Sequence, residues 1–371
     1  MKIAIITSIA TSLVNFRGPL IAEMIRRGYD VLAFAPDHDD ETRAGLKRLG
    51  ARPIDYGLSR TGINPVHDAL GLIGLYRLLR RHRPDATLSY FVKPVIYGTL
   101  AARLAGVPRR YAMIEGMGFT FTSDGVPGWR KKMLQWIVVR LFRASLSFVT
   151  KLLVLNPDDR NEFLQRRLVR PDRLRLLGAI GLDLDAWAYS VPVTEPVTFI
   201  LVARMLRDKG IEEYAAAARL VRQRGLSARF LLVGGSDPNP TAVPVALLES
   251  WVAEGLVEWP GHVPVHPLLA RSSVFVLPSY REGLPRSTQE AMAMGRPVIT
   301  TDVPGCRETI VDGANGLLIP PRDAEALASA MEFFIANPER IVPMGLESRR
   351  LAEERFDVFR QNRKCLELID L

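Results

Sequence analysis

The amino-acid sequence predicts an α/β protein made of two doubly wound, Rossmann-like parallel-sheet domains in tandem, with the ligand site expected in a cleft that the two domains face. Its 371 residues suit two domains of roughly 150–200 residues each. Short apolar runs rich in β-branched residues alternate with stretches of helical period almost throughout. Residues 182–196 break this rhythm with two prolines and no periodicity, so we interpret them as a linker. The expected boundaries are 1–190, 191–355 and a C-terminal helix over 356–371 that could pack back onto the first domain.

The first half supplies the strands and helices of one such domain. Its apolar runs lie at 2–7, 30–35, 86–91, 110–114 and 152–155. Its amphipathic stretches lie at 17–27, 66–82, 95–105 and 157–168. The opening run could also begin a signal peptide, but it lacks a convincing cleavage site, and a buried first strand accounts for it equally well. We expect the strand.

The alternation restarts after the linker. Strands are expected at 197–204, 228–235, 274–279, 297–301 and 316–320. Helices are expected at 210–224, 243–254, 323–336, 338–355 and 357–370.

Composition excludes several classes of protein. A hydrophobic fraction of 48% excludes a disordered chain, and no uncharged apolar run is long enough to span a bilayer. Cys306 and Cys365 are the only cysteines, which argues against a disulfide scaffold or a cysteine-ligated metal and fits a reducing cytoplasm. No G-x-G-x-x-G follows a strand, which disfavours a dinucleotide oxidoreductase.

Charge is unevenly distributed. Residues 1–190 hold 29 Lys and Arg against 17 Asp and Glu, a net of +12, whereas residues 191–371 hold 20 against 23, a net of −3. A basic domain suggests an anionic partner: a membrane surface, a phosphorylated substrate or nucleic acid. No aromatic–basic recognition motif or zinc spacing accompanies the charge, so we expect no nucleic acid.

The richest motif is SYREGLPRSTQEAMAMGRPVITTDVPGCRETI, residues 279–310. It follows an apolar strand and opens a helix at about Arg286, where Gly283 and Pro285 allow a tight turn that brings backbone N–H groups close to an anion. Glu282 and Glu290 could accept hydrogen bonds from sugar hydroxyls. Either glutamate alone would more often be a solvated acid beside a helix start.

Two further strand ends carry candidate groups. Arg204 and Lys209, in VARMLRDKG, could hold one diphosphate from two sides, although a basic pair in a loop is more often solvated. LLVGGSDPN, residues 231–239, ends a strand in a glycine pair that includes Gly234.

In this order, and with the loop from His262 to Pro267, these motifs resemble the retaining glycosyltransferases of family 4, which have the GT-B fold. The resemblance covers nearly the whole chain, and the E-x7-E spacing of Glu282 and Glu290 carries much of its specificity. It implies that Arg204 and Lys209 bind the donor's diphosphate and stabilise charge on the departing nucleotide. Glu282 would lie near the donor sugar, and the remaining donor-binding positions would be Gly234, Gly283, Leu284, Pro285 and Glu290, the last on the ribose hydroxyls. The resemblance also implies a UDP-linked rather than GDP-linked donor and no metal, because the two cations take over its role.

Acceptor binding is expected in the first domain. Asn15, Phe16, Arg17 and Gly18 precede or open a helix, where Gly18 permits close approach to a phosphate and Arg17 could pair with it or simply be solvated. Lys93 stands at a strand-to-helix junction. Many relatives carry a His in the loop after the strand at 110–114, whereas this chain has Glu115 and Gly116 there. This departure makes Glu115 the candidate for contacting the acceptor hydroxyl, either as a base or only by binding it.

The combination N-F-R, K-P-x-x-Y-G and E-G-x-G-F-x-F-T resembles the bacterial branch that glycosylates undecaprenyl-diphosphate-linked sugars, nearest to N-acetylgalactosaminyltransferases of protein-glycan and O-antigen assembly. Such an enzyme would be cytoplasmic and peripheral to the inner face of the cytoplasmic membrane. Residues 128–148, rich in Trp, Arg and Lys, fit an anionic leaflet, whereas 66–82 is better interpreted as a core helix with a solvated basic face.

The sequence therefore predicts a retaining transferase that moves a hexose or N-acetylhexosamine, best N-acetylgalactosamine, from a UDP-sugar to a lipid-linked saccharide. A GT-B UDP-sugar epimerase is the alternative, since it binds UDP-sugars between two such domains but needs no membrane surface. An inactive scaffold that keeps the same residues is a further alternative.

Overall fold

The computed structural model describes residues 1–58, 64–116, 129–239 and 241–371. The chain forms two compact units: unit 1 is Met1–Gly181 with Val358–Leu371, and unit 2 is Leu182–Asp357. The division falls earlier in the chain than residue 190, and the last helix belongs to unit 1.

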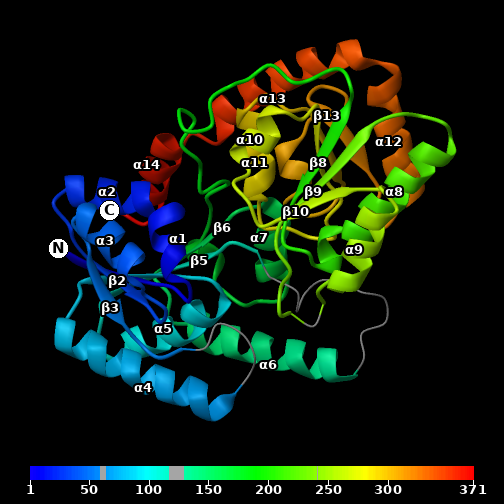
Figure 1. The fold of residues 1–371 in the computed structure, drawn as a ribbon. Helices are drawn as coiled ribbons and strands as arrows, with labels where there is room; N and C mark the ends of the chain where they lie inside the picture. The colour runs from blue at the N-terminus through cyan, green and yellow to red at the C-terminus, as the bar shows by residue number, and fades with distance from the viewer. Residues whose placement is uncertain (59–63, 117–128, 240) are drawn as a thin grey trace. The chain divides into compact units, whose positions relative to one another are not determined.

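Unit 1 is a parallel sheet of seven strands covered by helices on both faces (Figure 1). Its strands are β1 (Lys2–Ile6), β2 (Asp30–Ala35), β3 (Arg52–Asp55), β4 (Ala86–Tyr90), β5 (Arg109–Ile114), β6 (Lys151–Val154) and β7 (Leu174–Leu176). Its helices are α1 (Ala10–Asn15), α2 (Gly18–Arg26), α3 (Asp40–Arg48), α4 (Pro65–His82), α5 (Val92–Leu104), α6 (Trp129–Leu146), α7 (Pro157–Gln165) and α14 (Val358–Leu368). The strand order is β3-β2-β1-β4-β5-β6-β7, so the order reverses between β1 and β4.

Unit 2 repeats this plan with six parallel strands. They are β8 (Thr198–Val202), β9 (Arg229–Val233), β10 (Glu258–Gly261), β11 (Val274–Leu277), β12 (Val298–Thr301) and β13 (Gly316–Ile319). The helices are α8 (Ile211–Gln223), α9 (Val245–Ala253), α10 (His266–Ala270), α11 (Arg286–Ala293), α12 (Ala324–Ala336) and α13 (Ile341–Arg355). The order β10-β9-β8-β11-β12-β13 places the reversal between β8 and β11. The predicted α/β fold with two doubly wound parallel sheets is confirmed.

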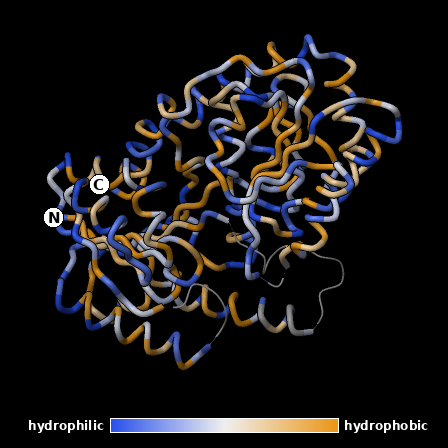
Figure 2. The backbone as a smooth tube through the Cα atoms, viewed as in Figure 1, coloured by the Kyte–Doolittle hydropathy of each residue, from blue (hydrophilic) through white to orange (hydrophobic). Residues whose placement is uncertain are grey.

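The central strands form the core of each unit because both of their faces are covered. All five residues of β4, Ala-Thr-Leu-Ser-Tyr, and all four of β11, Val-Phe-Val-Leu, are buried, as expected for strands of a parallel sheet that is covered on both faces. Figure 2 shows hydrophobic segments inside each unit and many hydrophilic residues on the outside.

The strands that the sequence analysis did not predict lie at sheet edges. β3, β7 and β10 are three of the four edge strands among the described residues, and their segments Arg-Pro-Ile-Asp, Leu-Arg-Leu and Glu-Trp-Pro-Gly contain no continuous apolar run. The fourth, β13, has the apolar run Leu-Leu-Ile and was predicted. An edge strand is covered less fully, and Pro is tolerated there, so its sequence loses the pattern that marks a buried strand.

The stretch interpreted as a linker is packed onto unit 2. The fully buried Arg296 donates from Nη2 to the carbonyl oxygen of Ser190 at 2.9 Å, and Arg349 donates to the carbonyl oxygen of Trp187 at 3.0 Å. Asp183 accepts hydrogen bonds from the backbone N–H groups of Asp185 and Ala186, so its carboxylate closes a local turn.

The C-terminal segment, Val358–Leu371, packs against the rest of unit 1. Helix α14 packs on α2, and Lys364 Nζ donates to the carbonyl oxygen of Leu177 at 2.5 Å. Asp370 pairs with Lys151 at 2.6 Å. Within the described ranges, no helix has the length and apolarity needed to cross a membrane.

Candidate functional site

The candidate donor site lies in unit 2 where β8 and β11 end. Ligands of open α/β sheets bind beyond the carboxyl ends of the strands at the point where the strand order reverses. The loop after β8 carries Arg204 and Lys209, and the loop after β11 carries Glu282, so the reversal brings both loops to one place.

Lys209 and Glu282 are in direct contact. Lys209 Nζ lies 2.6 Å from Glu282 Oε1, and Ser279 Oγ donates to the same oxygen at 2.7 Å. The side chains of Lys209 and Glu282 are only 17% and 14% exposed. Burial acts to lower the pKa of Lys209, but the charge and hydrogen bond of Glu282 outweigh burial, so the pKa is raised and the amine stays cationic.

The loop that carries Glu282 is held by its backbone. Glu282 N donates to the carbonyl oxygen of Pro304 at 3.0 Å, and Thr301 Oγ1 donates to the carbonyl oxygen of Ser279. Gly305, with φ of 81°, packs so closely that a Cβ there would collide with the carbonyl oxygen of Glu282. The position of the carboxylate is therefore set by β12 and the turn after it.

Helix α11 begins at Arg286, as predicted, directly after this loop. Gly283 and Pro285 are buried and Leu284 is half-buried. Pro285 stands at the N-cap and makes no side-chain capping bond. The N-terminus of a helix favours an anion through its backbone N–H groups and its dipole.

Arg204 and Glu290 lie at the edge of this arrangement. Arg204 is 54% exposed, and its Nη1 lies 2.9 Å from Asp237 Oδ2. Glu290 pairs with Arg286 at 2.9 Å, yet burial outweighs this cation and raises the pKa of Glu290. Arg204 also acts electrostatically on Lys209, so its charge is felt at the pair.

Gly234 is fixed by close packing at the end of β9. Its φ is 145°, and a Cβ there would overlap the carbonyl oxygen of Ala203. The backbone of β9 therefore approaches the loop after β8 more closely than any side chain would allow.

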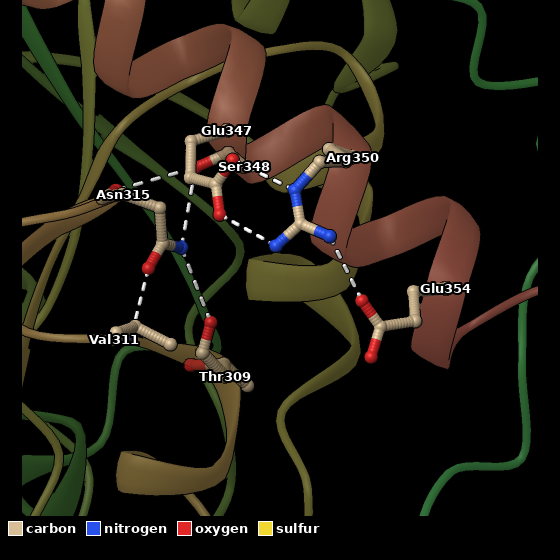
Figure 3. Close-up of polar contacts among 7 residues, drawn as sticks. All are labelled: Thr309, Val311, Asn315, Glu347, Ser348, Arg350 and Glu354. Atoms are coloured by element: carbon tan, nitrogen blue, oxygen red, sulfur yellow. Dashed lines mark hydrogen bonds and ion pairs between the residues drawn. The ribbon is translucent and has the colours of Figure 1, made fainter.

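The turn at 311–316 directly follows the motif at 279–310 and is held by a buried hydrogen-bond network. Asn315 is fully buried, its Nδ2 donates to the carbonyl oxygen of Thr309 and to Ser348 Oγ, and its Oδ1 accepts from Val311 N (Figure 3). Ser348 Oγ in turn donates to the carbonyl oxygen of Asn315 at 3.2 Å. This network joins the turn before β13 to α13.

Three residues near the donor site were not singled out from the sequence. Ser279 shares Glu282 Oε1 with Lys209, and Asp237 pairs with Arg204. Asp208 precedes Lys209; burial raises its pKa, and the negative charge of Glu282 raises it further against the opposing effect of Lys209. The polar residues S-x-x-E and R-D-K were visible in the sequence, but their partners are set by the fold.

In unit 1 the equivalent reversal lies between β1 and β4. Arg17 is 3% exposed and stands at the N-cap of α2, and its Nη2 forms an ion pair with Glu115 at the end of β5. Its guanidinium also lies over the ring of Tyr90, 4.9 Å from the centroid. The structure therefore brings together two predicted acceptor residues, and Arg17 is a buried partner of Glu115 rather than a solvated side chain.

Tyr90 extends this network. Its hydroxyl lies 2.7 Å from Ser12 Oγ, and burial, opposed by the charge of Arg17, raises its pKa to about 12. Phe91, which follows it, has a φ of 68°, an uncommon conformation for a bulky residue that often marks a functional site. Neither Tyr90 nor Phe91 was singled out from the sequence.

The other acceptor candidates differ in position. Asn15 and Phe16 are exposed at the end of α1, Gly18 is buried as the first residue of α2, and Gly116 is half-buried beside Glu115. The rest of the E-G-x-G-F-x-F-T stretch, 117–122, lies outside the described residues.

Lys93 has a structural partner. Its Nζ lies 2.8 Å from Oδ1 of Asp68, a carboxylate on α4 that is 2% exposed, and Tyr97 Oη donates to the other oxygen of Asp68 at 3.1 Å. Gly98 lets α5 approach the sheet, since a Cβ there would lie 2.7 Å from Ser89 Oγ. The K-P-x-x-Y-G motif thus binds α5 to α4 and to the sheet.

Two family models match the chain. Residues 16–179 match the glycosyl transferase 4-like domain, and residues 196–337 match glycosyl transferases group 1. The two matches together span most of unit 1 and of unit 2.

Among curated proteins, the chain is 26% identical to N,N'-diacetylbacillosaminyl-diphospho-undecaprenol alpha-1,3-N-acetylgalactosaminyltransferase of Campylobacter jejuni, over 90% of this chain and 89% of that protein. It is also 26% identical to UDP-Gal:alpha-D-GlcNAc-diphosphoundecaprenol alpha-1,3-galactosyltransferase of Escherichia coli, over 72% of this chain and 71% of that protein.

Solved structures share the fold. Sucrose-phosphate synthase of Thermosynechococcus elongatus aligns with a TM-score of 0.82 at 20% identity, covering 100% of this chain and 98% of that one. The Anabaena protein HepE in complex with UDP aligns with a TM-score of 0.77 at 17% identity, covering 100% of both chains. With both sheets, both family matches and these neighbours in agreement, the chain belongs to the family 4 glycosyltransferases of the GT-B fold.

Proposed function

We propose that the protein is a retaining glycosyltransferase that moves a hexose or N-acetylhexosamine, best N-acetylgalactosamine, from a UDP-sugar to an undecaprenyl-diphosphate-linked saccharide. The product would serve assembly of cell-surface polysaccharide, O-antigen or protein glycan at the inner face of the cytoplasmic membrane. The names of the two curated relatives support the lipid-linked acceptor, since both act on undecaprenol diphosphate saccharides.

The observation that carries this proposal is the contact between Lys209 and Glu282 at the strand reversal of unit 2. An ammonium group has three N–H donors, so one bond to Glu282 leaves two for a diphosphate. Glu282 Oε1 accepts from Lys209 and Ser279, and a carboxylate retains acceptor capacity at Oε2 for a sugar hydroxyl. The pair can therefore bind the diphosphate and the sugar of a nucleotide sugar at once.

The reaction breaks the bond between the anomeric carbon and the diphosphate, and negative charge develops on the leaving UDP. Lys209, Arg204 and the N-terminal turn of α11 would stabilise that charge, which is the main catalytic contribution a protein can make here. In this proposal the two cations serve where other transferases use a metal ion. The acceptor hydroxyl then forms a bond to the anomeric carbon on the face that UDP leaves, and its proton passes to the departing phosphate oxygen.

Glu115 would orient the acceptor in unit 1. It forms an ion pair with Arg17, and a carboxylate accepts hydrogen bonds and donates none. A positioned carboxylate of this kind would hold the acceptor hydroxyl, and front-face transfer requires no separate base.

The first test supplies purified protein with radiolabelled UDP- and GDP-sugars and with undecaprenyl-diphosphate-linked saccharides. Label from a UDP-sugar should enter the organic extract, and the product's anomeric configuration by NMR should match that of the donor. The Lys209→Ala variant should lose this label, and Lys47→Ala, an exposed lysine on α3, should keep it.

Three outcomes would contradict the proposal. Label taken only from a GDP-sugar would reject the donor, and an inverted product would reject the retaining mechanism. Conversion of the UDP-sugar to its epimer without label in any acceptor would establish an epimerase instead.

A further inference from the structure

Two helices of unit 1 carry the same pattern of exposed side chains. On α4, Val66, Leu70 and Ile73 are followed by Arg77 and Arg80. On α6, Trp129, Met133 and Trp136 are followed by Arg140 and Arg143. In both helices the spacing is i, i+4, i+7, i+11 and i+14. At about 100° per residue these positions stay within about 40° of one line, so each helix presents a single stripe about 21 Å long.

The stripes are exposed to solvent although half of each is apolar. The six apolar side chains are between 44% and 71% exposed, and the four arginines are exposed as well. Residues 66–82 were expected to form a core helix with a solvated basic face, and the inner face is indeed buried through Leu75 and Leu79. The outer face carries exposed arginines, but it also starts with three exposed apolar residues. Ordinary surfaces scatter such residues singly, and aligned exposed groups mark an interaction site.

The two stripes belong to one layer of the fold. Helix α5 packs against both α4 and α6, and all three cover the same face of the seven-stranded sheet (Figure 1). Helix α4 connects β3 to β4, and α6 connects β5 to β6. Both are crossover helices of one parallel sheet, so they run in the same direction. The apolar halves of the two stripes therefore lie toward one end of this layer and the arginine halves toward the other.

The charge on this surface has one sign. Helix α6 contains no Asp or Glu, and the only acid of α4, Asp68, is buried and paired with Lys93. Arg81 and Lys132 add exposed positive charge beside the stripes. Arg140 lies over the ring of Trp136 at 5.0 Å, which joins the apolar and basic halves of the α6 stripe.

Each stripe ends at an arginine that lines a cavity. Arg143 borders a cavity of about 640 Å³ together with Arg167, Arg170 and Arg173. Arg80 borders one of about 350 Å³ together with Arg83. No acidic residue lines either cavity within the described chain, so both favour an anionic group such as a phosphate.

We propose that the outer face of α4 and α6 is a docking surface for an anionic phospholipid bilayer, with the apolar halves of both stripes entering the interface and the arginine halves contacting headgroup phosphates. Trp at the boundary between lipid and water, arginine at the phosphates and apolar side chains below are the arrangement that an interfacial helix requires. The purpose of this surface rests on the proposed function, because a lipid-linked acceptor must be reached at a membrane.

The positive charge of this surface favours an anionic bilayer over a second copy of the chain as its partner. A second copy of this face would offer the arginines no carboxylate from either helix, and two positively charged faces repel each other. An anionic leaflet attracts each nearby arginine, by an amount equivalent to about a fivefold gain in partitioning.

The test is vesicle flotation of the full chain without donor or acceptor. Vesicles of phosphatidylcholine containing phosphatidylglycerol should carry the protein, and vesicles of phosphatidylcholine alone should carry much less. The tryptophan emission should shift to shorter wavelength on binding, and a variant with Trp129→Phe and Trp136→Phe should lose that shift, since these are the two exposed tryptophans on the stripe.

Two variants separate the halves of the stripes. Replacing Leu70, Ile73, Met133 and Trp136 by Ser should abolish binding to both vesicle types. Replacing Arg77 and Arg140 by Gln should weaken binding to anionic vesicles by about 25-fold, at about fivefold for each arginine. The matched controls are Val245→Ser with Val252→Ser on α9 and Arg271→Gln, all exposed in unit 2, and these should bind as the wild type does.

The proposed docking surface would be contradicted if the wild-type protein failed to float with anionic vesicles. It would also be contradicted if the stripe variants floated as well as the wild type. A dimer in sedimentation velocity that the apolar variant converts to a monomer would assign the face to a second copy instead. Transfer to a detergent-dispersed acceptor is measured separately. Lost transfer with intact flotation would reject the proposed function alone, and lost flotation with intact transfer would reject the surface alone.

Discussion

Lys209 Nζ lies 2.6 Å from Glu282 Oε1, and the two residues follow β8 and β11, the neighbouring strands at which the order of the second sheet reverses. Unit 1 also holds a cation against a carboxylate: Arg17 at the N-cap of α2 pairs with Glu115, which follows β5, in a sheet that reverses between β1 and β4. Each unit thus holds a buried cation against a carboxylate at the edge where ligands of such sheets bind. A cation already satisfied by a carboxylate is held in place before a diphosphate arrives.

Removing either member of the donor pair should reduce turnover by about 10²–10³, the usual loss when one stabiliser of transition-state charge is removed. Lys209→Ala and Glu282→Ala test this by initial rates with saturating acceptor. Glu249→Ala, an exposed glutamate on α9, is the matched control and should retain full rate. Near-wild-type rates for both site variants would reject the donor assignment.

The pH dependence of UDP binding should report the same pair. Glu282 raises the pKa of Lys209 above its ordinary value of 10.5, against the effect of burial, so the charge of Lys209 is present at neutral pH and is lost only as pH rises through that raised value. In Glu282→Gln, burial acts without this opposition, and the pKa of Lys209 should fall. Calorimetric titration with UDP should show its alkaline loss of affinity at lower pH in Glu282→Gln than in the wild type. If the two proteins lose affinity for UDP at the same alkaline pH, Lys209 does not bind the diphosphate.

Gly305 should control the position of the donor loop. In Gly305→Ala, the new Cβ meets the carbonyl oxygens of Glu282 and Gly283, so the loop must move, at a cost of about 1–3 kcal/mol. Gly313→Ala is a matched control, because Gly313 has a similar φ of 74° and no neighbour within 4 Å of the added Cβ. The Tm of thermal unfolding and the affinity for UDP should both fall further in Gly305→Ala than in Gly313→Ala. Equal losses in the two variants would mean that only backbone strain matters.

The parts of the fold that were predicted are those with a local signal. β1 and β11 are buried central strands with apolar runs, Ile-Ala-Ile-Ile and Val-Phe-Val-Leu, whereas β3 and β10 lie at edges and were missed. Helix α11 was predicted to begin at about Arg286 because a Gly-Leu-Pro turn precedes it.

Pairings between distant residues had no local signal. Arg17 and Glu115 are 98 residues apart, and each was predicted to contact the acceptor on its own. Asp68 was not singled out at all, because nothing near it shows that Lys93 and Tyr97 converge on it across two helices. The roles of the site residues remain predictions, whereas their positions are now set.

Lys93 should prove structural rather than acceptor-binding. Lys93→Met leaves the carboxylate of Asp68 buried without its cation, which should lower the free energy of unfolding by about 3–5 kcal/mol. The double variant with Asp68→Leu removes the buried charge as well and should recover most of that loss in urea unfolding. If Lys93 instead contacted the acceptor, the double variant would regain stability but keep a raised KM for acceptor.

Unlike Lys93, Glu115 should be needed both for stability, through its pair with Arg17, and for sugar transfer. Glu115→Gln leaves the guanidinium of Arg17 buried beside a neutral group, whereas Arg17→Met leaves a carboxylate that is 18% exposed and still partly hydrated. The first substitution should therefore destabilise the protein more, by about 3–5 kcal/mol, and the double variant Arg17→Met with Glu115→Leu should recover much of the loss in urea unfolding. Because Glu115 is proposed to hold the acceptor hydroxyl, the double variant should fold and bind UDP yet transfer no sugar. Recovery of transfer together with stability would show that the pair maintains the fold of unit 1 and does not contact the acceptor.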